Sequence, residues 1–387
     1  MTRNISIGID VGSSMTRIVV GEFLKGEQNP KIIGAGESPT FGMRHGYVIN
    51  IEEIASSVKK AAEIAERSSG IKIRRALVSL SGATLRSVVS TGVSIITKSD
   101  GEVTSLDVNK ALDECEDNLN LNNKKIIQVV PLSFRLDGKE VLGRLEGLRG
   151  NKLEAKALFV TYSSVHLEDL LAAVAEAGIE AVDVVPGGVA GSMIALSQRQ
   201  KVVGSAVVDI GAEKVSISIF ENGLLSSIHT FSIGGEDITN DIALGMKIPL
   251  ETAESLKLGN LIEEYSKKKL EEIIEARLSD IFELLENHLK KIKRSELLPA
   301  GIVFIGGGAN TPRLVELAED ALKLPSKIGE TEIFGNAKTK LRDPAWFIAL
   351  GTIIAVRGKE EYSGNSFHQF WKETKKTLKS GLKQLMP

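Results

Sequence analysis

The fold is decided by the stretch Ile5-Ser-Ile-Gly-Ile-Asp10-Val-Gly12-Ser13-Ser14-Met-Thr16-Arg-Ile-Val-Val-Gly-Glu-Phe23. The residues from Ile5 to Val11 are almost all apolar, as expected of a strand that is buried on both faces. Gly12 permits a backbone conformation that other residues avoid, so the chain can turn sharply at this point. We therefore predict two strands joined by a very tight turn.

The turn of this hairpin carries polar groups of a kind that bind phosphate. Ser13, Ser14 and Thr16 bring hydroxyl and backbone N–H donors next to the glycine, and such a concave set can hold phosphate oxygens. Asp10, at the end of the first strand, can hold the waters of a hydrated Mg²⁺. Aspartate and glycine are also ordinary turn residues, so a purely structural role is the alternative.

The chain repeats this hairpin 199 residues further along. Ile9-Asp10-Val11-Gly12 aligns with Val208-Asp209-Ile210-Gly211, and each copy lies between two strand-like segments. Repetition of a whole unit indicates two similar lobes. Two facing hairpins, with Asp10 and Asp209 at their mouths and Gly12 and Gly211 in their turns, would hold a nucleotide phosphate tail and its metal from both sides.

A third glycine-rich turn follows a short buried strand late in the chain. Gly306, Gly307 and Gly308 stand between that strand and a helix, where a backbone without side chains can approach a ligand closely. A flexible turn is the alternative reading of the same three residues.

Taken together, the paired hairpins and the glycine turn resemble the superfold of actin, the heat-shock chaperones and the sugar kinases. The resemblance implies ATP with Mg²⁺ as the ligand, and water-mediated contacts of Asp10 and Asp209 with the metal. It also implies that Glu254 and Lys257 flank the nucleoside. Their spacing places both on one helical face, where an ordinary surface salt bridge is the alternative.

Length and composition fit a two-lobed protein of the reducing cytoplasm. The 387 residues are enough for two lobes of roughly 150 to 200 residues. The net charge of −2 gives no reason to expect a nucleic-acid partner. Cys115 is the only cysteine and has acidic neighbours, so neither a disulfide framework nor a reactive thiolate is expected. No signal peptide is expected, and no segment reaches the length of about 18 apolar residues that spans a bilayer.

The order of predicted elements divides the chain into an α/β protein with an insert. Residues 83–162 predict strand, helix, strand and strand, a small α+β subdomain that carries no catalytic groups and is suited to protein contacts. Residues 265–294 predict a long amphipathic helix buried in the second lobe, with a coiled-coil partner helix as the alternative. The predicted domains are 1–82, 163–201 and 340–358 for the first lobe, 202–339 for the second, a linker at 359–366 and a helix at 367–387.

Further motifs resemble one family, that of the bacterial cell-division protein FtsA, over essentially the whole chain. They are Gly42-Met43-Arg44, Leu80-Ser81-Gly82, Val130-Pro131-Leu132 and Ala300-Gly-Ile-Val-Phe-Ile-Gly-Gly-Gly308. The resemblance implies an ATP-binding adaptor that forms filaments with itself and tethers FtsZ to the inner face of the cytoplasmic membrane at the division site. It implies that the FtsZ C-terminal tail docks on the second lobe near Arg277, and that later division proteins bind residues 83–162.

Two departures from the family pattern concern ATP hydrolysis. Val185 stands before Pro186 where many members carry a glutamate that helps to position the attacking water. The second turn, Gly211-Ala-Glu213-Lys214, replaces a more glycine-rich turn with threonine, and Glu213 would repel a γ-phosphate unless it faces away. We therefore expect ATP binding with slow or absent hydrolysis, and assign no catalytic residue beyond Asp10 and Asp209 as ligands of metal-bound water.

The C-terminal segment has the composition of a helix that lies in a membrane surface. On a helix its aromatic and aliphatic residues share one face, and five lysines with one glutamate occupy much of the rest. Docking on the protein itself or on a partner is the alternative. The residues expected to contact anionic lipid are Phe367, Phe370, Trp371, Lys375, Lys376, Leu378, Lys379, Leu382, Lys383 and Leu385.

Two other functions remain open from the sequence. A small-molecule kinase of the same superfold would need a catalytic base and has no use for the amphipathic tail. An adaptor of type IV pilus machines that resembles PilM would share the insert but bind an inner-membrane peptide.

We expect that removal of the Phe370 and Trp371 side chains releases the protein from anionic liposomes. Each aromatic contributes less than its full burial value of roughly 1.5–3 kcal/mol at an interface, and each lysine about 1 kcal/mol, so a single helix binds reversibly. Cosedimentation with liposomes measures the loss, and unchanged pelleting would contradict the membrane role.

Overall fold

The computed structural model describes residues 4–27, 29–260, 265–331 and 339–362. The chain forms two compact units. The body comprises residues 1–87, 123–127 and 160–355, whereas the inserted unit comprises 88–122 and 128–159, with residues 356–362 grouped with it. Of the helices within the described ranges, none combines the length and apolarity needed to cross a membrane.

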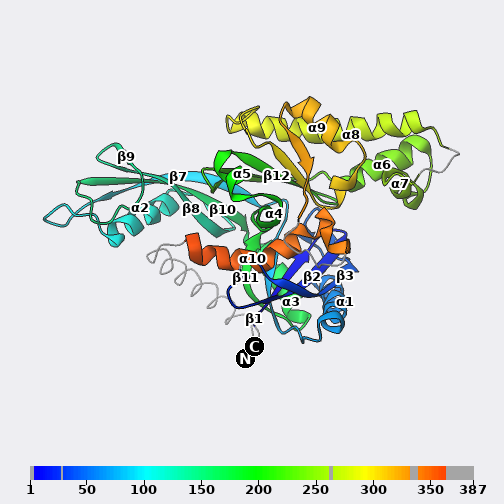
Figure 1. Ribbon diagram of the computed structural model, residues 1–387, viewed down its shortest axis with the longest axis horizontal. Coiled ribbons are helices and arrows are strands. Elements are labelled where there is room, and N and C mark those ends of the chain that lie inside the picture. The colour runs from blue at the N-terminus through cyan, green and yellow to red at the C-terminus, as the bar shows by residue number, and fades with distance from the viewer. Residues whose placement is uncertain (1–3, 28, 261–264, 332–338, 363–387) are drawn as a thin grey trace. The chain divides into compact units, whose positions relative to one another are not determined.

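The body contains two five-stranded sheets with the same topology (Figure 1). The strand orders are β11-β6-β1-β2-β3 and β16-β15-β12-β13-β14, and in both sheets a parallel part is extended by an antiparallel hairpin and a third strand. The first sheet consists of β1 (Asn4–Val11), β2 (Met15–Phe23), β3 (Lys31–Pro39), β6 (Arg75–Leu80) and β11 (Glu180–Pro186). The second consists of β12 (Ser205–Ile210), β13 (Val215–Glu221), β14 (Leu224–Phe231), β15 (Ile302–Ile305) and β16 (Ser326–Ile328).

The repeat seen in the sequence extends to the register of the two hairpins. Asp10 pairs with Arg17 across β1 and β2, and Asp209 pairs with Ser216 across β12 and β13. Both aspartates therefore occupy the same place at the end of the first strand. The predicted actin-like fold of two similar lobes is confirmed.

Helices with small side chains lie between the two sheets of the body. Helix α4 (Gly187–Ala195) contacts strands of both sheets, and it crosses α10 (Phe347–Tyr362) at a very close approach. A Cβ atom built on Gly351 would lie 1.8 Å from the carbonyl oxygen of Ala190, so only glycine fits at this crossing. On the first sheet, α1 (Ile51–Ser69) begins at its cap Asn50 and packs with α3 (Ser164–Glu176).

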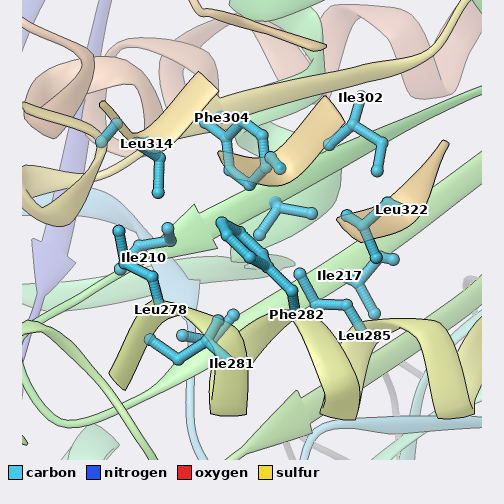
Figure 2. Packing of buried hydrophobic residues seen from close by; sticks show 14 of the residues in the cluster. Ile210, Ile217, Leu278, Ile281, Phe282, Leu285, Ile302, Phe304, Leu314 and Leu322 are labelled. Carbon is cyan, nitrogen blue, oxygen red and sulfur yellow. The ribbon is translucent and has the colours of Figure 1, made fainter. Parts of the chain in front are cut away.

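The second lobe is built around the longest helix, α8 (Lys267–Lys291). Figure 2 shows its apolar face, including Leu278 and Phe282, directed at side chains of β12, β13 and β15. Phe282 and Phe304 meet with ring centroids 6.3 Å apart in an edge-to-face arrangement. The prediction of a buried amphipathic helix within this lobe is therefore confirmed, and the coiled-coil alternative is not needed.

Smaller elements complete the body and correct one expectation. The remaining helices of the second lobe are α5 (Gln198–Val203), α6 (Gly235–Met246), α7 (Leu250–Lys257) and α9 (Leu314–Leu322), and short pieces are β4 (Met43–Arg44), β5 (Tyr47–Val48), η1 (Gly307–Asn310), η2 (Thr339–Arg342) and η3 (Pro344–Trp346). Helix α5 begins after Ser197, which caps it by accepting from the Gln200 N–H at 3.3 Å. The first residues of the predicted linker at 359–366 are helical, since α10 continues to Tyr362.

The inserted unit is an α+β fold, as expected. Its sheet has the order β7-β10-β8-β9, formed by β7 (Arg86–Ile95), β8 (Lys124–Leu136), β9 (Lys139–Val141) and β10 (Lys152–Ser163), and its helix is α2 (Ser105–Asp117). Burial, assisted by Glu114, raises the pKa of the Cys115 thiol to about 11. The prediction that Cys115 is no reactive thiolate is thus confirmed.

We expect the substitution Leu278→Ala to lower the free energy of unfolding by about 2–5 kcal/mol, because it opens a cavity beneath α8 in a fully buried position. The matched control is Leu244→Ala, since Leu244 is 78% exposed. Urea titrations of both variants provide the test, and equal losses would contradict the described core.

Candidate functional site

The turns of the two hairpins are closed by the same hydrogen bond. The Gly12 N–H donates to the Met15 carbonyl at 3.1 Å, and the Gly211 N–H donates to the Lys214 carbonyl at 2.9 Å. The carboxylates of Asp10 and Asp209, which precede these turns, are only 6% and 4% exposed. We call residues 10–16 and 209–214 together the paired-turn site.

The first turn presents a hydroxyl that the described protein does not satisfy. The Ser13 Oγ is buried and has no hydrogen-bond partner among the described residues, and such an atom costs roughly 1–3 kcal/mol. A phosphate oxygen would satisfy it, so this turn fits the predicted ligand. Ser14 is exposed beside it.

Thr16 lies behind the turn. Its side chain is fully buried, and its Oγ1 makes a 2.8 Å hydrogen bond with the Oγ1 of Thr40. The Thr40 N–H also donates to the Ser14 carbonyl at 2.8 Å. The contacts of Thr16 therefore support the shape of the turn, and direct nucleotide contact by this residue remains a prediction.

Asp10 is held by the neighbouring strand. The Ser79 hydroxyl, at the end of β6, donates to the Asp10 Oδ1 at 2.5 Å. The next strand, β11, places Val185 in register with Ser79, and this valine is 1% exposed. The position at which the family resemblance led us to expect a glutamate thus carries a buried apolar side chain beside Ser79.

The second turn directs a lysine at the first lobe. Lys214 is 4% exposed, and its ammonium donates to the carbonyl oxygen of Ser81, which follows β6. Burial lowers the pKa of Lys214, against the opposing effects of Asp209, Asp10 and Glu213. The sequence analysis had noted that this turn departs from the family pattern but had not assigned this lysine to the site.

Asp209 is the most strongly perturbed carboxyl group of the site. Burial is the largest cause that raises its pKa to about 6, and the negative charge of Asp10 adds to it. The positive charges of Lys214 and Arg17 act in the opposite direction. Asp10 and Asp209 therefore repel each other where little water can screen their charges. Nearby positive charges are needed to keep both carboxylates ionised.

Glu213 faces the backbone of the first lobe. Its Oε2 accepts a hydrogen bond from the His45 N–H at 2.6 Å. This hydrogen bond directs the carboxylate at His45 of the first lobe, and whether its charge acts on a γ-phosphate stays with the prediction. The same turn is held from its own lobe, because the Glu236 N–H at the start of α6 donates to the Ala212 carbonyl at 2.7 Å.

Glu254 and Lys257 form a polar cluster with a residue that the sequence had not indicated. The Lys257 Nζ donates to the Glu254 Oε2 at 2.6 Å and to the Thr239 Oγ1 at 2.8 Å, and Thr239 itself donates to Glu254 at 2.5 Å. Lys257 also donates to the carbonyl of Gly235 at 3.0 Å, at the start of α6. The cluster thus joins the predicted pair to Thr239, whose distance from Glu254 in the sequence matches no helical spacing that would have indicated this contact.

The glycine turn lies against the second aspartate. A Cβ built on Gly306 would be 2.3 Å from the Asp209 Oδ1, and φ of Gly306 is 84°. A Cβ on Gly308 would be 2.3 Å from the side chain of Ile210, whereas one on Gly307 would meet nothing within 4 Å. Gly306 and Gly308 are therefore required by packing, and Gly307 faces open space where a ligand can approach.

These contacts also test the fit of the implied ligands. The unsatisfied Ser13 hydroxyl and the open side of Gly307 fit a nucleotide. A resident Mg²⁺ fits less well, because the buried Lys214 ammonium already acts electrostatically on both Asp10 and Asp209. Among the described residues, no three His, Cys, Asp or Glu side chains gather as metal ligands.

Two further groups of residues were predicted to contact a partner protein or the membrane. Arg277, on α8, is 29% exposed at its side chain, and it pairs with Asp241 at 2.6 Å and Asp280 at 3.3 Å. A partner carboxylate at Arg277 would have to compete with these pairs, and its role in docking remains a prediction. The predicted membrane residues, from Phe367 to Leu385, fall outside the described part of the chain.

Comparison with known sequences finds one family along the chain. The profile described as "Cell division protein FtsA" matches residues 206–351, and the profile "SHS2 domain inserted in FTSA" matches residues 82–161. The cell division protein FtsA of Bacillus subtilis is 30% identical over 90% of this chain and 82% of its own length.

Comparison with solved structures finds the same fold at low identity. A chain of the PilM–PilN type IV pilus biogenesis complex superposes with a TM-score of 0.68 and 18% identity, over 90% of this chain and 98% of that one. MreB5 of Spiroplasma citri bound to ADP gives a TM-score of 0.56 and 13% identity, over 93% and 99%. At these identities the likeness shows the fold alone.

We expect Gly306→Ala and Gly307→Ala to separate packing from ligand contact. Gly306→Ala should lower the melting temperature, because its positive φ and its contact with Asp209 both disfavour a side chain. Gly307→Ala should leave the melting temperature unchanged but weaken ADP binding, measured by calorimetry. Unchanged ADP affinity in Gly307→Ala would contradict a ligand at this turn.

Proposed function

This chain belongs to the FtsA family of cell division proteins, and from this premise we propose that it is an ATP-binding, actin-like adaptor that forms filaments and tethers FtsZ to the inner face of the cytoplasmic membrane at the division site. The observation that carries the nucleotide part of the proposal is the paired-turn site. There the unsatisfied Ser13 hydroxyl and the buried aspartates of both lobes lie together. ADP in the similarly folded MreB5 structure is consistent with this ligand.

In the proposed complex each predicted residue has a separate task. The hydroxyls of Ser13 and Ser14 and the other N–H groups of the first turn hold phosphate oxygens. Gly12 and Gly211, whose own N–H groups close the two turns, let the backbone approach these oxygens. The cluster of Glu254 and Lys257 flanks the nucleoside, and the turn at Gly307 approaches the nucleotide from the second lobe. Mg²⁺ held through water by Asp10 and Asp209 remains a prediction that the position of Lys214 does not favour.

Slow or absent ATP hydrolysis is part of the proposal. General-base catalysis requires a group that can accept a proton within reach of the attacking water. Val185 has no group that can accept a proton. Its strand position pairs with Ser79, whose hydroxyl donates to Asp10. The nucleotide would therefore act mainly by holding the two lobes in one arrangement, as a ligand that binds one conformation more tightly than another.

The partners of the proposed adaptor are assigned to different parts of the chain. The FtsZ C-terminal tail docks near Arg277 on the second lobe, and later division proteins bind residues 83–162. Anionic lipids bind the helix predicted at residues 367–387. A filament presents many such helices at once, and the resulting multivalency turns weak single contacts into stable attachment.

The alternative adaptor of a type IV pilus machine has less support. The likeness to the PilM–PilN structure is a likeness of fold at 18% identity, whereas the cell division protein of Bacillus subtilis is 30% identical over 90% of this chain. A small-molecule kinase would need a catalytic base, and the side chain of Val185, in register with Ser79, cannot serve as one.

The adaptor function predicts tail-dependent pelleting with anionic liposomes that ATP enhances, because filaments present several membrane helices together. Cosedimentation of the full chain with ATP, ADP or no nucleotide measures this, beside a version that ends at Gly364. Attachment should weaken as salt rises, since the lysine contacts with lipid are screened. Absence of pelleting under all conditions would overturn the membrane-tethering proposal.

A further inference from the structure

Lys214 occupies a special position in the duplicated hairpin. It closes the second turn as Met15 closes the first, through the same backbone hydrogen bond from Gly12 or Gly211. The two lobes thus offer an internal comparison at one equivalent position: a neutral side chain in one turn and a buried ammonium in the other.

The surroundings of the ammonium are those of a bound cation. Two carboxylates of opposite lobes, Asp10 and Asp209, both act on it electrostatically. Its one hydrogen bond to a described residue goes to the Ser81 carbonyl of the first lobe. An ammonium has three N–H donors, so two remain for a ligand that enters the paired-turn site.

The turn that carries Lys214 is held in place from both lobes. His45 fixes Glu213 from the first lobe at 2.6 Å, and the start of α6 fixes Ala212 from the second at 2.7 Å. The lysine stem packs over Gly211, where a built Cβ would lie 3.6 Å from its Cγ. The ammonium is therefore placed in advance near Asp10, at the end of the strand that leads into the turn with the unsatisfied Ser13 hydroxyl.

We propose that Lys214 is a built-in cation of the paired-turn site, which binds the phosphate tail of a nucleoside diphosphate or triphosphate directly and makes its binding independent of Mg²⁺. This inference rests on the proposed nucleotide binding. A lysine is an effective point charge for phosphate, and a fixed positive charge beside Asp10 and Asp209 fills the role that a dication would otherwise have. The same contact with Ser81 links the lobes, so the cation also favours the arrangement in which both turns face one ligand.

The test is the affinity for ADP and for AMP, measured by calorimetry on the full chain in EDTA and in Mg²⁺. The wild type should bind ADP within about threefold of the same affinity in both buffers. Lys214→Met, which copies the residue of the first hairpin, should weaken ADP binding by about tenfold or more in EDTA and recover it in Mg²⁺. AMP has no β-phosphate, so its affinity should change far less.

Two further variants control for folding and charge. Lys201→Met removes another buried lysine, one that lies over Phe220 at the far end of the same hairpin, and it should leave ADP affinity unchanged in both buffers. Lys214→Arg should keep the independence from Mg²⁺. Mg²⁺ alone should raise the melting temperature of Lys214→Met but not that of the wild type, which also reports that this variant is folded.

The outcomes separate this inference from the function on which it rests. Wild-type ADP binding that occurs in Mg²⁺ but is lost in EDTA would overturn the role of Lys214 and leave nucleotide binding intact. Equal ADP affinity of Lys214→Met and the wild type in EDTA would do the same. Absence of ADP and ATP binding by the wild type in both buffers would overturn the proposed nucleotide function, and this inference with it.

Discussion

Two carboxylates buried at the ends of two equivalent strands impose the strongest constraint on this structure. Asp10 and Asp209 are almost inaccessible to water and repel each other, and burial of uncompensated charge is very costly. Ser79 supplies a hydrogen bond to the first, and Lys214 supplies positive charge near both. A site in which two buried carboxylates are balanced by a buried lysine is organised to bind a charged ligand. The same charges determine both the stability of the fold and the binding of that ligand.

The duplicated architecture explains how the site is kept in shape. The sheets place the two hairpins at equivalent interior positions, and α4 and α10 cross between the sheets at the small residues Ala190 and Gly351. Because close-packed helices transmit displacement rather than absorb it, a ligand held by both turns would favour one arrangement of the lobes. In the proposed adaptor this coupling connects nucleotide occupancy with filament formation, and filament formation with membrane attachment.

Local sequence patterns predicted most of the fold and the framework of the site. The hairpin repeat, the long amphipathic helix and the glycine turn depend on periodicity and on short spacings, which a sequence displays directly. Lys214, Ser79 and Thr239 were missed, because their roles come from contacts with residues distant in the chain, such as Ser79 with Asp10. Short elements such as β16 were not predicted for a different reason, since three residues are too few to show the alternation of apolar and polar side chains that is typical of a strand.

The central claim is that both lobes hold the phosphate tail of one nucleotide at the paired-turn site, and an experimental structure of the full chain with ADP tests it most directly. The account predicts that the β-phosphate lies within hydrogen-bonding distance of the Ser13 hydroxyl in the first turn and of the Lys214 ammonium in the second. A nucleotide bound elsewhere on the protein, or a β-phosphate that contacts neither turn, would contradict the account.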